Sequence, residues 1–146
     1  MININELLLI IIFIIIFLII LYNKKPNTYF SKIELKKSPI AGLGVFAKSD
    51  FEVGDIIEIA PIIKVKREDI GGIINDYIFT VPDEGMTSIA LGWVSLYNHS
   101  DDNNATWRVD GDSIIIICIK DIKKGEEIFV SYGEDYWNTR NNLIKK

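Results

Sequence analysis

The sequence is poor in the residues that build metal sites and disulfides. Its 146 residues include one cysteine, Cys118, and one histidine, His99. A single cysteine excludes an intrachain disulfide, a cysteine-rich zinc cluster and a C-x-x-C redox pair. A histidine-based metal site would have to be completed mostly by carboxylates, so we predict no metal. The length favours one modest domain over a large multidomain enzyme.

A surplus of positive charge is also missing. The chain has 16 lysine and arginine residues against 20 aspartate and glutamate residues, a formal net charge of −4. This balance argues against a dedicated DNA-binding protein, and we predict no direct contact with nucleic acid. The C-terminal half gathers acidic residues, which indicate either a solvated acidic face or a groove that attracts a basic peptide. They are Asp101, Asp102, Asp110, Asp112, Glu126, Glu127, Glu134 and Asp135.

One long hydrophobic run stands apart from an otherwise ordinary composition. Leu7 to Leu21 is fifteen consecutive Leu, Ile and Phe residues. As a helix it would span roughly 22 Å, short of the ~30 Å hydrocarbon core, with apolar neighbours on both sides to extend it. It lacks the polar face of a buried core helix. It also lacks the basic start and the A-x-A site of a cleaved signal peptide. We predict a transmembrane helix at 1–22, an uncleaved N-terminal anchor.

The charges around this run predict its orientation. No lysine or arginine precedes it, and five lysines follow within about twenty residues, so the positive-inside rule places the C-terminal domain on the cytosolic side of the membrane. The sequons at Asn98 and Asn104 would then stay unglycosylated. If the run is not an anchor, the alternative location is the nucleus. The lysines are Lys24, Lys25, Lys32, Lys36 and Lys37.

The rest of the chain predicts a short linker at 23–30, one domain at 31–137 and a polar tail at 138–146. The domain is mostly β, because short β-branched and apolar runs alternate with glycine-rich turns. A hairpin is expected at Asp110-Gly111. Short helices fit near Glu68 to Phe79 and Thr87 to Leu96. The expected strands are Ile33 to Leu35, Val45 to Ala47, Ile56 to Ile59, Ile62 to Val65, Ile114 to Ile119 and Ile128 to Ser131.

Three motifs follow one another in this domain. They are the G-x-G of Ala41 to Phe46, the Asn98-His99-Ser100 segment followed by Asn104, and the run from Gly125 to Gly133. Each alone has an ordinary reading: a turn, a satisfied Asn-His pair, and a hairpin with solvated carboxylates beside a core tyrosine. A Rossmann loop is excluded, because the third glycine is missing and Val45-Phe46 continues as a strand.

In this order and spacing the motifs resemble the SET-domain lysine methyltransferases. The resemblance covers Ile33 to about Trp137 and looks closest to the small viral SET proteins of large DNA viruses. The segments that look like that group are Asp76 to Phe79, Ala90 to Gly92 and Ser131 to Trp137. It implies a fold of several small curved β-sheets with a knot-like crossing, formed where 98–104 meets the strand ending at Tyr132.

The resemblance implies a site for S-adenosyl-L-methionine as the cofactor. Gly42, Leu43 and Gly44 let the backbone approach the cofactor, because glycine carries no side chain. Asn98 would hold the amino-acid end of the cofactor. The backbone at His99 would receive the adenine, which makes His99 an unsuitable general base. Trp137 would cover the adenine.

The resemblance also implies a channel for the substrate lysine. Tyr132 is the catalytic residue, whose hydroxyl orients the lysine amine. Tyr77, Tyr97 and Tyr136 would line the channel, and aromatic walls suit both a methylene stem and an alkylated cation. Methyl transfer to an amine needs a sulfonium donor, a neutral amine and a channel that aligns them, but neither a metal nor a strong base.

The sequence departs from the family pattern at three positions. Asp101 replaces the usual cysteine, Asn103 the usual proline, and Ser131 the frequent aspartate before the catalytic tyrosine. The zinc-binding flanks of many chromosomal members cannot form with one cysteine. The segment Tyr136-Trp137 would therefore have to complete the channel without metal.

These observations predict a protein-lysine N-methyltransferase that acts on a histone tail and so regulates chromatin. Its partner would be a basic peptide, and the viral resemblance adds a homodimer that acts on the lysine of an A-R-K-S motif. Two alternatives stay open: a methyltransferase for a non-histone viral or cytosolic protein, and a catalytically silent, membrane-anchored SET module.

Overall fold

The computed structural model describes residues 10–18 and 32–138. Residues 10–18 form a helix whose apolar side chains are exposed, Phe13 to 75%. Among the described residues, no helix is long and apolar enough to cross a membrane. The predicted anchor at 1–22 lies mostly outside the described residues, as do the linker at 23–30 and all but the first residue of the tail at 138–146.

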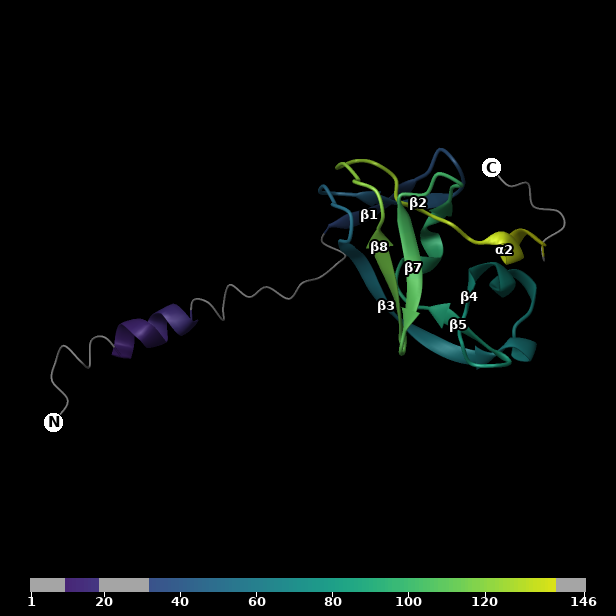
Figure 1. Ribbon diagram of the computed structural model, residues 1–146, viewed down its shortest axis with the longest axis horizontal. Helices are drawn as coiled ribbons and strands as arrows, with labels where there is room; N and C mark the ends of the chain where they lie inside the picture. The colour runs from purple at the N-terminus through teal and green to yellow at the C-terminus, as the bar shows by residue number, and fades with distance from the viewer. Residues whose placement is uncertain (1–9, 19–31, 139–146) are drawn as a thin grey trace.

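Residues 32–138 are mostly β, as predicted (Figure 1). The strands form three sheets: a hairpin of β1 and β2, a five-stranded sheet ordered β4-β5-β3-β8-β7, and a parallel pair, β6 and β9. The strands are β1 (Ile33–Lys37), β2 (Leu43–Ala47), β3 (Ile56–Lys66), β4 (Ile78–Thr80), β5 (Met86–Ala90), β6 (Asn98–His99), β7 (Ala105–Asp110), β8 (Ser113–Cys118) and β9 (Phe129–Val130). The short helices are η2 (Arg67–Asp69), η3 (Gly72–Tyr77), η4 (Val94–Leu96) and α2 (Glu134–Asn138).

The long strand β3 joins two strands that the sequence predicts separately. It pairs with β8 up to Pro61 and with β5 from Ile62 onwards. Proline cannot donate to a ladder and is confined to the places where pairing is interrupted. Pro61 stands at that change of partner, and its carbonyl still accepts a 2.8 Å hydrogen bond from the Leu91 N–H. The proline therefore marks a change of partner within one strand.

The helix predicted from Thr87 to Leu96 is wrong. Its first part is β5, which pairs with β3 on one side and β4 on the other, and only Val94–Leu96 forms one 3-10 turn. Local propensity is weak where a sheet offers two neighbours, and cross-strand packing decides such a segment. The prediction near Glu68 to Phe79 holds for η2 and η3, but Ile78 and Phe79 already belong to β4.

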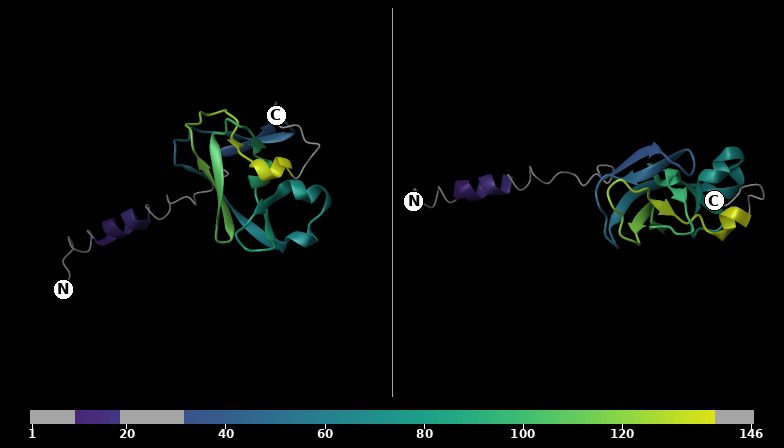
Figure 2. Two further views of the ribbon diagram at one scale, coloured as in Figure 1. Left: turned by 45° about the vertical axis from the view of Figure 1, so that its right-hand side comes forward. Right: turned by 90° about the horizontal axis from the view of Figure 1, so that it is seen from above.

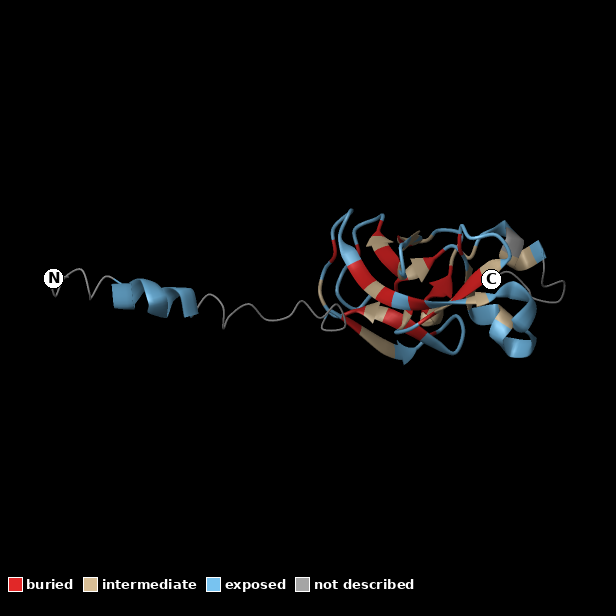
Figure 3. Cartoon of the chain, turned by 90° about the horizontal axis from the view of Figure 1, so that it is seen from below, coloured by how far each residue is buried: buried red, intermediate tan, exposed pale blue. Residues whose placement is uncertain are grey.

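The core lies between the β1–β2 hairpin and the five-stranded sheet. Val45 and Ala47 of β2 are fully buried, together with Ile57 of β3 and Ile114 of β8. Figure 3 shows this burial concentrated on the strands, while η2 and η3 are exposed. The predicted hairpin at Asp110 is confirmed, since Asp110 pairs with Ser113 and Gly111 takes a positive φ of 58°.

The last described segment runs back across the molecule. Phe46 and Glu127 form an isolated antiparallel bridge, and β9 then lies parallel to β6. Beyond β9, helix α2 (yellow) lies at the same end of the domain as the η3 segment (teal), as both views of Figure 2 show. The three motifs, far apart in the sequence, are thereby brought to one place.

Candidate active site

The G-x-G motif lies where the β1–β2 hairpin turns. Gly42 has a φ of 49°, a conformation that favours glycine, and its carbonyl accepts a 3.0 Å hydrogen bond from the Ser38 N–H. Gly44 is needed for a different reason. A Cβ at Gly44 would lie 2.8 Å from Glu127 Cδ and 3.1 Å from Asn98 Nδ2. The absence of a side chain at Gly44 therefore lets Asn98 and Glu127 pack against the backbone of β2.

The amide of Asn98 is held in one orientation. Its nitrogen donates to the carbonyls of Ala41 and Leu43, both at 3.2 Å, and to Glu127 Oε1 at 2.7 Å. All three partners are acceptors, so the NH₂ group must face them. The Asn98 Oδ1 atom consequently points the other way and remains an acceptor for a ligand that donates.

Glu127 is a site residue that the sequence reading misses. A Gly-Glu-Glu turn is ordinarily solvated, yet only Glu126 is exposed here and Glu127 is 7% exposed. Its second oxygen accepts a 2.9 Å hydrogen bond from Ser38 Oγ. No local signal distinguishes the two glutamates, because what buries Glu127 is the approach of Ser38 and Asn98 from distant parts of the chain.

His99 is buried and contacts the site through its Nδ1 atom. Its Nδ1 accepts a 3.2 Å hydrogen bond from the Tyr132 N–H, and Nε2 lies 3.2 Å from Asp101 Oδ1. An accepting Nδ1 is unprotonated, so in the neutral ring the proton is on Nε2. The ring therefore holds the backbone N–H of Tyr132 in place. The backbone of His99 itself pairs with Val130, because β6 lies beside β9.

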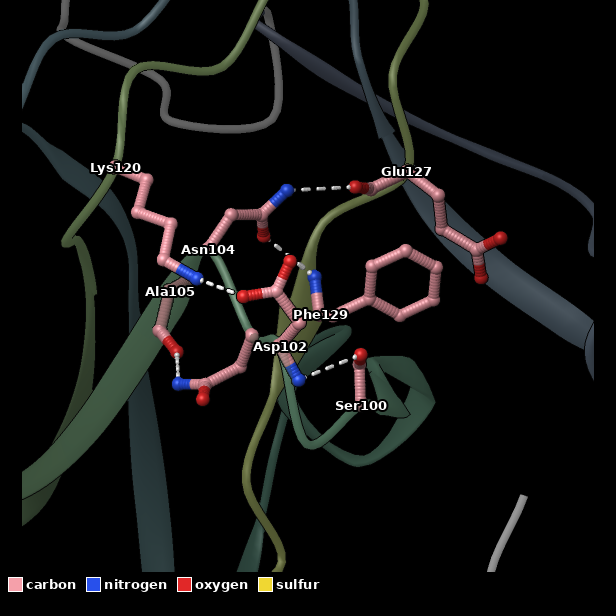
Figure 4. Close-up of polar contacts among 8 residues, drawn as sticks. Ser100, Asp102, Asn104, Ala105, Lys120, Glu127 and Phe129 are labelled. Atoms are coloured by element: carbon pink, nitrogen blue, oxygen red, sulfur yellow. Dashed lines mark hydrogen bonds and ion pairs between the residues drawn. The ribbon is translucent and has the colours of Figure 1, made fainter.

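Asn104 ties the second motif to the third, as Figure 4 shows. Its Nδ2 donates to the Glu127 carbonyl at 3.0 Å, and its Oδ1 accepts from the Phe129 N–H at 2.8 Å. The side chain imitates a strand backbone, which offers one donor and one acceptor to its neighbour. The parallel pairing of β6 and β9 is thus secured at the predicted meeting of 98–104 with the strand that leads to Tyr132.

The hydroxyl of Tyr132 is directed by a backbone carbonyl. It donates a 2.8 Å hydrogen bond to the Tyr97 carbonyl oxygen. Burial is the main reason that the pKa of Tyr132 rises to about 12, and the nearby Tyr136, Tyr77 and Glu127 add to it. Tyr132 is therefore a neutral phenol at physiological pH, with its proton engaged and its oxygen lone pairs available.

A cavity of about 720 Å³ opens beside Tyr132, within the range of small-molecule sites. All three predicted wall residues border it: Tyr77, Tyr97 and Tyr136. Tyr97 is deeply buried, at only 1% exposed. The cavity is also bordered by residues that the sequence reading does not single out, among them Phe79, Trp107, Arg67 and Thr87.

An aromatic cluster closes the site on the α2 side. Trp137 packs against His99 at 5.0 Å between ring centroids and stacks on Tyr132 at 6.2 Å, while Tyr136 lies 4.7 Å from Tyr132. The indole N–H of Trp137 is buried and has no hydrogen-bond partner among the described residues. Such an orphaned donor is expensive to leave unpaired and suits an acceptor on a bound ligand.

The structure thus brings together Tyr132, Asn98, His99, Gly44 and Trp137, from three motifs and α2. In the part of the chain that the structure describes, no group of three His, Cys, Asp or Glu side chains could hold a metal.

Comparisons with known proteins identify this arrangement. The family model described as the SET domain matches residues 42–133. A histone-lysine N-methyltransferase of Schizosaccharomyces pombe, specific for H3 lysine-37, is 31% identical over 114 residues, which are 73% of this chain and 77% of that protein. The S. pombe histone-lysine N-methyltransferase set9 is 30% identical over 79% of this chain, which spans 26% of that protein.

Solved structures agree with these relatives. A Plasmodium falciparum protein assigned as a histone methyltransferase superposes with a TM-score of 0.65 at 33% identity, covering 73% of this chain and 96% of that one. ctPRC2 bound to S-adenosylmethionine superposes with a TM-score of 0.60 at 27% identity, over 70% of this chain and 15% of that one. The matched motifs, the fold and these relatives lead to one conclusion: the chain belongs to the SET-domain family, in which these relatives are histone-lysine N-methyltransferases.

Proposed function

We propose that the protein transfers a methyl group from S-adenosyl-L-methionine to the ε-amine of a lysine in a histone tail. The observation that carries the proposal is the Tyr132 hydroxyl, whose proton is held by the Tyr97 carbonyl beside an aromatic-walled cavity. A phenol oxygen with its proton engaged can accept a hydrogen bond from the substrate N–H. Tyr132 would therefore orient the amine and leave the nitrogen lone pair free for the displacement.

Tyr132 is not the base that removes the lysine proton. Its pKa of about 12 keeps it a phenol. A free lysine has a pKa near 10.4, so only a small fraction of it is neutral at pH 7. Burial in a cavity walled by Tyr77, Tyr136 and Phe79 disfavours the ammonium form and raises that fraction. The aromatic rings also hold the methylene stem and exclude water.

A second group of residues fits the cofactor. When bound, S-adenosyl-L-methionine supplies an activated methyl group. Asn98 presents its Oδ1 as an acceptor for an ammonium, because its NH₂ group is occupied. The buried N–H of Trp137 offers a donor, and the bare backbone at Gly44 allows close approach. Asn98, Trp137 and the 42–44 segment would hold the cofactor, with the His99 backbone beside them.

The histone substrate is supported by relatives that are histone-lysine N-methyltransferases. Two acidic residues, Asp76 and Glu134, border the cavity against one basic residue, Arg67. This balance favours a lysine flanked by basic residues over an acidic peptide. The proposal includes the two features that the viral resemblance implies: the protein acts as a homodimer, and its target is the lysine of an A-R-K-S motif.

A tritium-transfer assay tests the function. The full chain is incubated with tritiated S-adenosyl-L-methionine and core histones, with the Tyr132→Phe variant as the matched control. Label on histones that disappears in the variant supports the proposal. Label only on other proteins of a lysate would favour the non-histone alternative. Bound cofactor without any transfer would contradict both and leave a silent module.

We also propose that the run from Leu7 to Leu21 anchors the domain to a membrane on its cytosolic side. The fifteen apolar residues support this, as does the exposure of apolar side chains along 10–18. Carbonate extraction of the full chain should leave it in the membrane pellet. Release into the supernatant would contradict the anchor and favour the nucleus.

A further inference from the structure

A buried carboxylate lies behind the active site and has no place in the mechanism so far. Glu58 of β3 is 0% exposed. A charge taken out of water is costly unless hydrogen bonds compensate it. Among the described residues, no lysine, arginine or histidine forms a salt bridge with Glu58, and its compensation consists of two neutral donors.

Those two donors bracket the turn that precedes the second motif. Glu58 Oε1 accepts a 2.8 Å hydrogen bond from the Trp93 N–H, and Oε2 accepts a 2.9 Å hydrogen bond from the Tyr97 hydroxyl. Trp93 and Tyr97 flank η4, the 3-10 turn Val94–Leu96. One carboxylate therefore holds both ends of this turn against the five-stranded sheet.

Tyr97 connects this carboxylate to the catalytic tyrosine. Its hydroxyl binds Glu58, and its own carbonyl is the acceptor for the Tyr132 hydroxyl. The Tyr97 ring cannot move independently of that carbonyl, because the residue is 1% exposed and packed into the core. The direction of the Tyr132 hydroxyl is thus set by a residue that Glu58 holds in place.

We infer that Glu58 is a positioning residue for methyl transfer, acting through Tyr97 to keep the Tyr132 proton pointed away from the substrate amine. If Tyr97 shifts, the Tyr132 hydroxyl loses its acceptor and can turn its proton toward the amine nitrogen. It would then compete for the lone pair that the displacement needs. This inference rests on the proposed methyltransferase function. Burial raises the pKa of Glu58, which is consistent with a carboxylate retained at a cost for its geometry.

Tyr97→Phe is the sharpest test, because it removes one hydroxyl and keeps the ring. We expect kcat to fall about tenfold, as for the loss of one positioning hydrogen bond. The affinity for S-adenosylhomocysteine and the KM for the peptide should stay within about twofold of wild type. Ser88→Ala is the matched control, since it deletes another fully buried hydroxyl, one that donates to the Phe79 carbonyl. It should leave kcat unchanged.

Glu58→Gln supplies the conservative rescue. Its amide can still accept from the Trp93 N–H and can donate to the Tyr97 oxygen, so we expect it to retain most of the wild-type kcat. Glu58→Ala should resemble Tyr97→Phe or fold poorly, and in the second case Tyr97→Phe decides the question.

A double mutant separates positioning from general damage to the fold. If Glu58 and Tyr97 act through the Tyr132 hydroxyl, Tyr97→Phe should cost little further activity in a Tyr132→Phe background. An equal fractional loss in both backgrounds would overturn the inference, as would full kcat in Tyr97→Phe. These results can be distinguished from a failure of the proposed methyltransferase function, because in that case the wild-type protein would transfer no label to any protein.

Discussion

The Asn98 amide donates a 2.7 Å hydrogen bond to Glu127 Oε1, and both side chains pack against the bare backbone of Gly44. Residues from the three motifs meet at this contact. It explains why the second glycine of the G-x-G motif is required: the space that a side chain would need is already filled by a carboxylate and an amide.

Gly44→Ala should therefore disrupt the cofactor side of the site. The new methyl group would displace the Glu127 carboxylate and break its hydrogen bond to Asn98, an interaction worth about 1.5–3 kcal/mol when one partner is charged. We expect the affinity for S-adenosylhomocysteine, measured by calorimetry, to fall about tenfold or more. Gly71→Ala is the control, because Gly71 has extended backbone and open space around it. Equal affinities for the two variants would contradict this account.

Tyr132→Phe should separate binding from turnover. It removes the hydroxyl that orients the amine but keeps the ring that packs against Trp137 and Tyr136. We expect kcat for peptide methylation to fall about 100-fold, the cost of a misplaced reacting group. Cofactor affinity should change little. Full activity in this variant would remove Tyr132 from the mechanism.

The ionisation of Tyr132 should be absent from the working pH range. Since burial raises its pKa to about 12, a difference titration of wild type against Tyr132→Phe, followed by phenolate absorbance, should show no ionisation until the pH approaches that value. The rise of kcat/KM with pH would then report the substrate lysine. A phenolate signal near the ordinary tyrosine value of 10 would show that Tyr132 is solvated.

Asn104→Ala should destabilise the fold more than the same substitution at the neighbouring Asn103 does. It leaves the Phe129 N–H and the Glu127 carbonyl, which are partly buried, without their partner, and an unsatisfied buried group costs about 1–3 kcal/mol. We expect a loss of about 2 kcal/mol or more in urea denaturation. Asn103→Ala removes one local hydrogen bond to the Ala105 carbonyl and should cost about 1 kcal/mol or less. The reverse order would show that the Asn104 amide does not secure β9.

Glu58 should make stability depend on pH in a defined direction. Burial raises its pKa above the ordinary 4.5, so the folded state holds the proton more tightly than the unfolded chain. Its contribution is greatest below pH 4.5 and is lost as the pH rises through the raised pKa. As the pH rises from 4.5 through the raised pKa of Glu58, the free energy of unfolding of wild type should therefore fall relative to that of Glu58→Gln. A constant difference between the two, in denaturant titrations at several pH values, would contradict the shift.

The sequence predicts much of this fold because its signals are local. Strand β8 is a run of isoleucines after a glycine turn, and the hairpin at Asp110 follows from the same pattern. The segment 87–96 shows where local sequence signals fail to predict secondary structure. Its residues have no strong preference, and β5 forms there because β3 and β4 lie on either side.

The candidate site divides in the same way. Tyr132, Asn98, His99 and the two glycines follow from motifs in order, and the structure places them together. The burial of Glu127, which lies in the third motif, and of Glu58, which lies in none, does not follow from the local sequence. One reads as a solvated turn residue and the other as a charge within a strand, yet they are 7% and 0% exposed.

The sequence by itself determined the family resemblance: three ordered motifs resemble those of the SET-domain lysine methyltransferases, and that resemblance implies methyl transfer to an amine. Only the tertiary structure decided how the tyrosine hydroxyl is aimed. Its proton is held by the Tyr97 carbonyl, and Tyr97 is held by Glu58, 39 residues away in the chain. The physical reason is that a hydrogen bond needs its donor and acceptor about 3 Å apart, and only the folded sheet brings these groups so close.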